Sequence, residues 1–126
     1  FHAPVAEGTR WCMRWNHSVA GFTVSDCYLY DGAHMVLEKS HQPDFAAGLG
    51  HIEGRGVQRA AAEGGYWIEG IGEIVPDNCY RLRVGAPRVN HRIGFGPRET
   101  SLSERAAGQP VRVAVRTAGD TESKSC

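Results

Sequence analysis

Arginine is concentrated in one stretch of this 126-residue chain, and its side-chain chemistry is the recognition of anions. Residues 81–116 contain eight arginines against two glutamates, whereas residues 1–80 contain five basic and ten acidic residues, so a net charge of zero hides a basic segment. The planar guanidinium pairs with phosphate and carboxylate groups through two parallel hydrogen bonds. The pattern predicts an anionic ligand, a phospholipid headgroup or a nucleic-acid backbone; the alternative is that these arginines only solvate the outer faces of strands.

The expected contact lies in residues 81–98. Its candidate ligand-binding residues are Arg81, Arg83, Arg88, His91 and Arg92. We expect bidentate arginine contacts to an anionic group, beside exposed aromatic side chains.

A metal-independent ribonuclease is a hypothesis from a different class, because that chemistry needs only a base, an acid and a cation that holds the phosphate. These residue types are supplied by Glu53 or His51, together with His91 and one of Arg81, Arg83 and Arg92. A loop-based inhibitor of another protein is a third hypothesis. Since a chain with six histidines and twelve arginines offers such sets easily, we expect a binding protein rather than an enzyme.

Metal and cofactor motifs are absent from the sequence. The six histidines include no pair at the i, i+4 spacing of a helical metal site. No GxSxG, HExxH, P-loop or strand-following GxGxxG pattern occurs. We therefore expect neither a metal site nor a cofactor.

The four cysteines predict disulfides. Cys12, Cys27, Cys79 and Cys126 include no CxxC pair, which favours two structural disulfides over a redox or metal site. Three pairings are open, and we favour Cys12–Cys27 with Cys79–Cys126, because Cys12 and Cys27 lie on strands expected to form a hairpin. Disulfides persist in oxidising compartments, so we expect a secreted, extracellular protein. The start at Phe1 is consistent with removal of a signal peptide.

Alternation of apolar and polar residues predicts about eight short strands. They cover residues 9–15, 20–30, 33–39, 45–52, 64–75, 79–84, 90–96 and 110–117. Asp31-Gly32 is typical of a hairpin turn, and the only helical signal is residues 101–107, where Ser101 and Glu104 have capping-box spacing. We expect one all-β domain over residues 1–126, an antiparallel β-sandwich or barrel with one short helix, and peripheral tails at 1–8 and 118–126.

The same alternation predicts which side chains face the core. The expected inward residues are Trp11, Met13, Trp15, Phe22, Val24, Tyr28, Tyr30, Tyr80, Leu82, Val84, Val111, Val113 and Val115. The arginines between them on strands 79–84 and 110–117 are expected to face solvent.

Several scattered motifs occur in order between Asn16 and about Gly96: NHSVAGFTV, YLYDGA, a P-x-x-A at Pro43, GRG followed by AAEGGYW, and YRLRVGAPRVN. In this order they resemble the β-sandwich of actinoporin- and aegerolysin-type membrane-binding proteins. The chain departs from actinoporins where residues 88–91, Arg-Val-Asn-His, replace a tyrosine-rich stretch, and where no amphipathic helix precedes the first strand.

The resemblance implies a site that binds a lipid headgroup. Pro87 and the residues after it would lie on the loop that approaches a lipid headgroup. Tyr66, Trp67 and Tyr80 would be the candidate aromatic contacts. The sequence as a whole thus predicts a secreted recognition module that binds a membrane lipid headgroup, a glycan or a partner protein.

Overall fold

The computed structural model describes residues 2–17, 22–42, 56–62 and 64–117, and its strands pair antiparallel throughout this part of the chain. The strands are β1 (Arg10–Asn16), β2 (Thr23–Tyr30), β3 (Met35–Gln42), β4 (Val57–Ala60), β5 (Tyr66–Glu69), β6 (Glu73–Ile74), β7 (Cys79–Arg83), β8 (Arg92–Phe95), β9 (Arg98–Ser101) and β10 (Pro110–Ala114). A 3-10 turn, η2 (Pro76–Asn78), and one helical turn, α1 (Ser103–Ala106), complete the described elements. The all-β prediction is confirmed.

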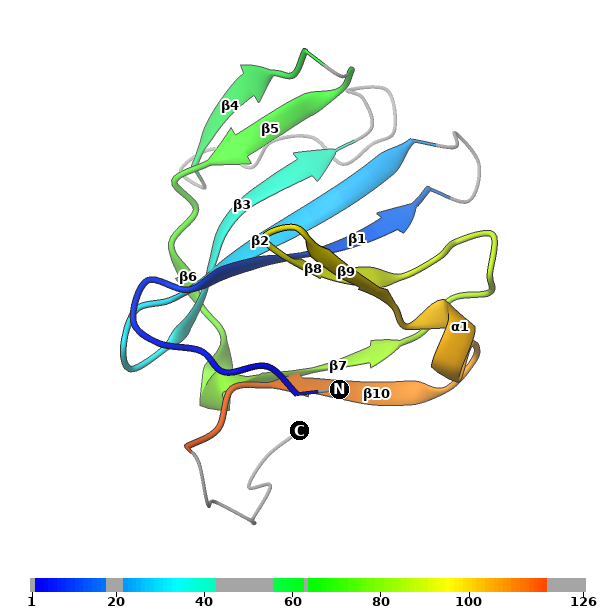
Figure 1. Ribbon diagram of the computed structural model, residues 1–126. Helices are drawn as coiled ribbons and strands as arrows, with labels where there is room; N and C mark the ends of the chain where they lie inside the picture. The colour runs from blue at the N-terminus through cyan, green and yellow to red at the C-terminus, as the bar shows by residue number, and fades with distance from the viewer. Residues whose placement is uncertain (1, 18–21, 43–55, 63, 118–126) are drawn as a thin grey trace.

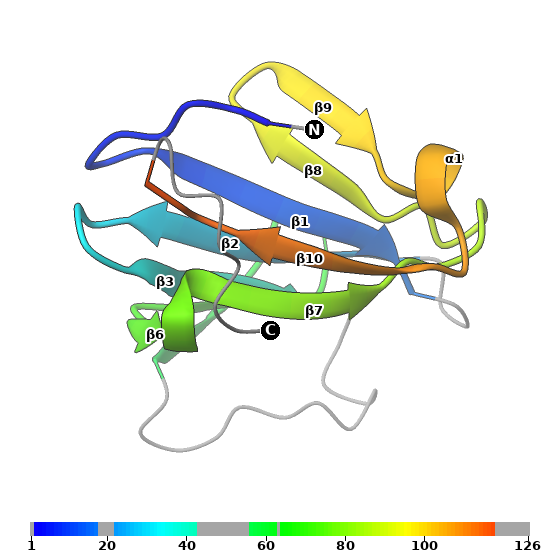
Figure 2. The ribbon, with the colours of Figure 1, turned by 90° about the horizontal axis from the view of Figure 1, so that it is seen from below.

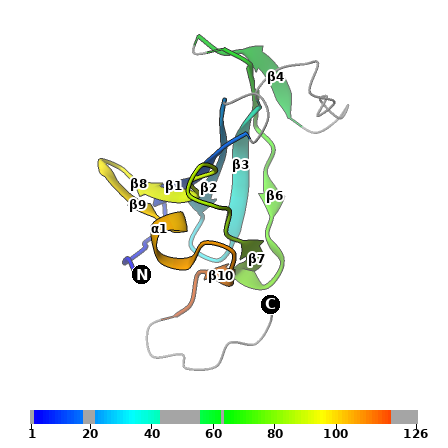
Figure 3. The ribbon, with the colours of Figure 1, turned by 90° about the vertical axis from the view of Figure 1, so that its right-hand side faces the viewer.

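The strands form two layers. The larger sheet has the order β4-β5-β3-β2-β1-β8-β9, with β6 beside β3, and the smaller sheet consists of β7 and β10. The smaller sheet faces the central strands β1 and β2 (Figures 1 and 2). The β4–β5 hairpin extends away from the smaller sheet, as the side view shows (Figure 3). The arrangement is sandwich-like, as expected.

The core lies between the two sheets, at positions set by strand alternation. Its buried cluster consists of Trp11, Met13, Tyr28, Met35 and Ile93, and Tyr80, Leu82, Val113 and Val115 pack against it from the smaller sheet and its continuation. One expected core residue is an exception, because Phe22 precedes β2 and is 39% exposed. The remaining expected inward positions are buried or half-buried.

The predicted turn at Asp31-Gly32 joins β2 to β3. The Asp31 carboxylate accepts hydrogen bonds from the backbone N–H groups of His34 (2.6 Å) and Ala33 (2.9 Å). These two bonds lower the pKa of Asp31, and the bond from His34 has the larger effect. Gly32 has φ +100°, a conformation that residues with a Cβ rarely adopt. The turn chemistry read from the sequence is therefore the chemistry that closes the hairpin.

One of the two expected disulfides, Cys12–Cys27, joins two described residues. It joins residues that lie directly opposite each other on β1 and β2, so the predicted hairpin pairing is confirmed. Cys126 lies outside the described residues, and its predicted bond to Cys79 stays a prediction. No described cysteine is free.

The two edges of the larger sheet were missed by the sequence prediction. These edge strands, β4 (VQRA) and β9 (RETS), are short, polar and mostly exposed, so they lack the apolar alternation on which the prediction depends. The strand expected at 45–52 lies outside the described residues. The Oγ of Ser101 accepts the Glu104 N–H at 3.2 Å, so the capping signal is real although α1 is a single turn. Residues 2–8, expected as a peripheral tail, include Val5, which packs against the core.

Candidate functional site

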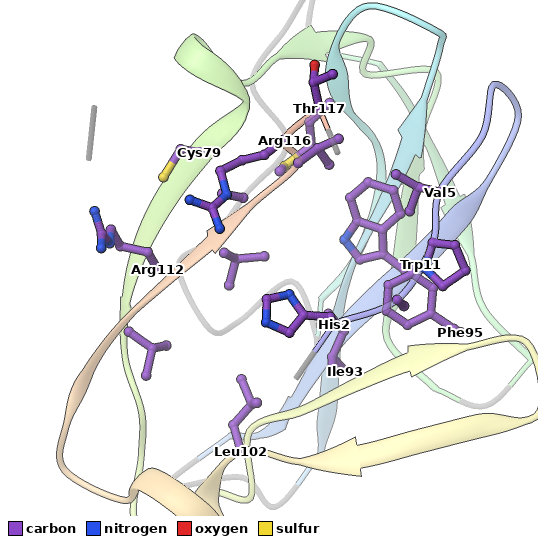
Figure 4. A pocket seen from close by; sticks show the side chains of 17 residues that line it. His2, Val5, Trp11, Cys79, Ile93, Phe95, Leu102, Arg112, Arg116 and Thr117 are labelled. Atoms are coloured by element: carbon purple, nitrogen blue, oxygen red, sulfur yellow. The ribbon is translucent and has the colours of Figure 1, made fainter. Parts of the chain in front are cut away.

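A cavity of about 850 Å³ lies between the two sheets (Figure 4). The larger sheet lines it with Trp11, Ile93 and Phe95, and the segment 111–115 lines it with Val111, Val113 and Val115. Protein interiors are packed as densely as organic crystals, and their voids are small and few. A space of this size is comparable to the pockets that hold small organic ligands.

The aromatic wall of the cavity is built by strand pairing. β1 pairs with β8, and this register places the Trp11 ring beside Phe95, with 5.8 Å between ring centroids. On its other side Trp11 stacks against Tyr28 at 5.9 Å. The three rings form one continuous apolar surface, which holds the Trp11 indole in a fixed position.

The indole N–H of Trp11 is a buried donor with no acceptor. Trp11 is only 3% exposed, and its Nε1 makes no hydrogen bond. An unpaired buried donor costs about 1–3 kcal/mol. Figure 4 shows this nitrogen turned toward His2 and the interior of the cavity. The wall thus contains one buried hydrogen-bond donor whose capacity is unused.

The charged groups of the cavity are basic. Arg112 and Arg116, both exposed, line its solvent side together with Thr117 and His2. Among the described lining residues there is no aspartate or glutamate. Arg116 has no ion-pair partner in the described part of the chain. The lining therefore combines apolar walls with donor groups and positive charge.

A second, smaller cavity of about 290 Å³ lies beside Tyr28 and Tyr80. Their rings stack at 5.4 Å. Burial is the main cause that raises the pKa of Tyr28 to about 12, and burial together with the neighbouring Tyr28 raises the pKa of Tyr80 still further. The Tyr80 hydroxyl has no acceptor within hydrogen-bond geometry. Both phenols stay neutral at physiological pH, which makes this cavity a weak candidate for acid–base chemistry.

The comparisons with known proteins give a family without a known activity. A domain of unknown function, DUF1850, matches residues 12–102. The chain belongs to the DUF1850 family. No curated protein and no solved structure matches it. The matched range of this DUF1850 chain runs from β1 to the residue before α1, so Trp11 and β10, which line the large cavity, lie outside it.

The resemblance to actinoporins and aegerolysins stays a prediction, but two of its aromatic contacts are misplaced for a surface site. Tyr66 is completely buried, so it cannot form an exposed aromatic contact. Tyr80 points into the core from β7. Trp67, on β5, is half-buried and packs against His41 at 5.0 Å, with the Nζ of Lys39 4.8 Å from its ring centroid. Tyr66 and Trp67 thus point to opposite faces of β5, and Tyr80 belongs to the other layer, so the three aromatics do not form one platform.

Two of the predicted basic residues stabilise the fold. His91 is 9% exposed, and its Nδ1 accepts the Gly85 N–H at 2.8 Å, while burial lowers the pKa of its imidazole. The Nη1 of Arg92 donates to the Asn90 carbonyl at 2.9 Å, and its Nε lies 3.6 Å from Glu99. These two side chains were expected to face a ligand, but their hydrogen bonds hold neighbouring strands and turns.

The other predicted contacts, Arg81, Arg83, Pro87 and Arg88, are exposed. Arg81 and Arg83 point outward from β7, where Arg83 donates to the Gly108 carbonyl at 2.8 Å. Pro87 and Arg88 lie in the exposed turn that follows β7. The loop position that the resemblance implied is therefore accessible, and whether it meets a lipid stays a prediction.

The ribonuclease set is not assembled by the described residues. His51 and Glu53 lie outside them. His91, the expected acid, has a pKa lowered by burial, and its Nδ1 accepts the Gly85 N–H, so this side chain stabilises the fold.

No described helix is long and apolar enough to cross a membrane.

The sequence prediction missed the cavity itself. Trp11, Val111, Val113 and Val115 were all predicted to face inward, which is correct, but alternation cannot distinguish a filled core from an open one. The only sequence signal was the tryptophan at position 11, since indole carries an N–H that a purely apolar core cannot satisfy.

Proposed function

We propose that this DUF1850 chain is a binding protein whose inter-sheet cavity holds the apolar part of a small lipid-like molecule. The observation that carries the proposal is the cavity of about 850 Å³ with aromatic and valine walls. Burial of an acyl chain or ring system against these walls contributes about 25 cal/mol per Å² of apolar surface. Affinity then comes from the cavity, and the lipid is recognised as a whole molecule rather than as a headgroup on the surface.

This proposal keeps the lipid ligand of the sequence hypothesis and moves the site. A glycan platform would need exposed, coplanar aromatic rings, whereas Tyr66 and Tyr80 point into the interior. A surface headgroup site at residues 81–92 would need His91 and Arg92, which are engaged inside the fold. The cavity needs neither residue.

The test is a titration with N-phenyl-1-naphthylamine, a neutral probe whose fluorescence rises in apolar surroundings. The wild-type protein should bind it saturably with about one site. Val113→Trp puts a large ring into the cavity and should weaken binding at least about tenfold, because it displaces probe volume.

The matched control is Val57→Trp, which makes the same change at a position that is 62% exposed on β4. This variant should bind the probe like the wild type. Leu102→Trp provides a second cavity variant in case Val113→Trp does not fold, and far-ultraviolet circular dichroism checks each one. The proposal would be refuted if the folded wild-type protein showed no saturable binding. It would also be refuted if both folded cavity variants bound the probe as tightly as the wild type.

A further inference from the structure

We infer that residues 2–5 form a displaceable strap across the side of the cavity, which opens to admit a ligand and closes again over the bound molecule. The inference rests on the proposed function and adds the control of access to that site. Its basis is a contrast within the N-terminal segment, since residues 6–9 are held by hydrogen bonds and residues 2–5 are held by packing alone.

The strap lies on the open side of the sandwich. The chain itself connects the two layers on one side, because β6 continues through η2 into β7, whereas β10 is an edge of the smaller sheet. In two views at right angles, the N-terminal segment runs between β10 and the β8–β9 hairpin (Figures 1 and 2). Residues 2–5 line the cavity together with Ile93 and Phe95 of β8 and with residues 111–117. The strap therefore spans the gap between the two layers.

The turn that follows the strap is fixed by four hydrogen bonds. The Ala6 N–H donates to the Oγ1 of Thr9 at 3.0 Å, and the Thr9 N–H donates to the Ala6 carbonyl at 2.9 Å. The Gly8 N–H donates to the Tyr30 carbonyl at 2.8 Å, and the Tyr30 N–H donates to the Thr9 carbonyl at 2.9 Å. These bonds tie the turn to the end of β2, so the strap can move only about a hinge at residue 6.

The strap itself has no bonds of this kind. No hydrogen bond or ion pair joins residues 2–5 to another residue in the described part of the chain. Pro4 has no backbone N–H, so the segment cannot pair continuously with a strand edge. Ala3 and Val5 are half-buried, His2 and Pro4 are exposed, and Val5 packs against the core cluster. Displacement of the strap therefore breaks apolar contacts, chiefly those of Val5, and no hydrogen bond.

Segments with few buried apolar contacts and no hydrogen bonds are the ones that open locally while the rest of the fold persists. The strap borders the cavity without filling it, because the volume of about 850 Å³ is present with residues 2–5 in place. It can therefore close over an empty or an occupied cavity alike. A loosened strap should speed both entry and release of the ligand and leave the affinity nearly unchanged.

The experiment is stopped-flow fluorescence with N-phenyl-1-naphthylamine in excess over the protein. In the wild type, the observed rate of binding should level off at high probe concentration, at the rate of strap opening. Val5→Ser replaces two methyl groups by one hydroxyl and should raise this limiting rate about three- to tenfold. The rate of probe release should rise by a similar factor, and the affinity should stay within about twofold.

The matched control is Val57→Ser, the same change at a position that is 62% exposed on β4 and does not line the cavity. Both of its rates should equal those of the wild type. Equal rates for the wild type and for folded Val5→Ser would overturn the strap inference, while saturable binding of the probe would leave the cavity proposal intact.

A measurement on the wild-type protein without ligand depends neither on the probe nor on the folding of a variant. Backbone ¹⁵N relaxation dispersion should show microsecond-to-millisecond exchange at Ala3 and Val5 and none at Gly8 and Thr9, which are held by the hydrogen-bonded turn. Flat dispersion at Ala3 and Val5 would overturn the strap inference whatever the probe does. Failure of the folded wild type to bind the probe would overturn the proposed function, and the dispersion at these two residues would then decide on the strap by itself.

Discussion

Removal of the Cys12–Cys27 disulfide should cost a stability that can be worked out from the chain length that it closes. The two cysteines are 15 residues apart. Loop closure of that length in the unfolded chain corresponds to about 3 kcal/mol at 25 °C. With an unfolding entropy of about 2.1 cal/mol/K per residue, a chain of 126 residues should lose roughly 11 °C in Tm. We expect this shift for the double variant Cys12→Ala/Cys27→Ala.

The assay is differential scanning calorimetry of the oxidised proteins, with the urea midpoint and slope as a second measure. The strands β1 and β2 pair over seven positions without help from the sulfurs, so the native fold should persist and the cavity should still bind its probe. A loss of less than about 3 °C would refute the reasoning, since it would mean that the unfolded chain without this disulfide already keeps the hairpin closed. An increased slope of unfolding in urea would confirm that the disulfide compacts the unfolded state.

Three further predictions concern buried polar groups. His41→Phe should destabilise the protein by about 1–3 kcal/mol in urea unfolding, because its ring nitrogens lie 3.1 and 2.7 Å from the carbonyl oxygens of Thr23 and Gly64; a change below about 0.5 kcal/mol would contradict this. Because burial lowers the pKa of His91 in the folded state, the contribution of neutral His91 to stability should be complete above the unfolded pKa of about 6.5 and should be lost as the pH falls below that value. This part of the pH dependence of stability should vanish in His91→Gln. An unchanged pH profile in that variant would contradict the prediction. Tyr28 and Tyr80 should remain neutral at pH values near 11 while the protein is folded. The 295 nm absorbance, which reports ionised tyrosine, should therefore rise equally near pH 11 in the wild type and in Tyr28→Phe/Tyr80→Phe. A larger rise for the wild type would show that the pKa values of these two tyrosines are lower.

Much of the fold follows from local patterns in the sequence. Period-two alternation located β1, β7 and β10 and the correct inward faces, because a strand between two layers has one apolar side. The turn at Asp31-Gly32 was predicted from chemistry that acts within four residues. Pairing of Cys12 with Cys27 followed from the hairpin expected between residues 9–15 and 20–30, which is β1–β2. The polar edge strands β4 and β9 were missed because pairing with a neighbour, and no pattern of their own, makes them strands.

The candidate site was predicted less well, because charge in a sequence segment does not specify direction in space. Arg81, Arg83, Arg88 and Arg92 are close in sequence, but the strand and turn that carry them point them to different surroundings. His91 looked like a ligand-binding residue and is the acceptor that holds the Gly85 backbone. A polar side chain on a strand can stabilise the fold or bind a ligand, and only its contacts in the tertiary structure distinguish the two roles.

The sequence by itself determined that this chain is an antiparallel β-protein with a linked first hairpin and an arginine-bearing second half, because these properties depend on local periodicity, turn residues and composition. The tertiary structure alone decided that a pocket lies between the layers, that the Trp11 N–H is buried in its wall without a partner, and that Arg116 lines the pocket. The physical reason is that a cavity depends on the distance between two sheets, which is set by contacts between residues far apart in the chain.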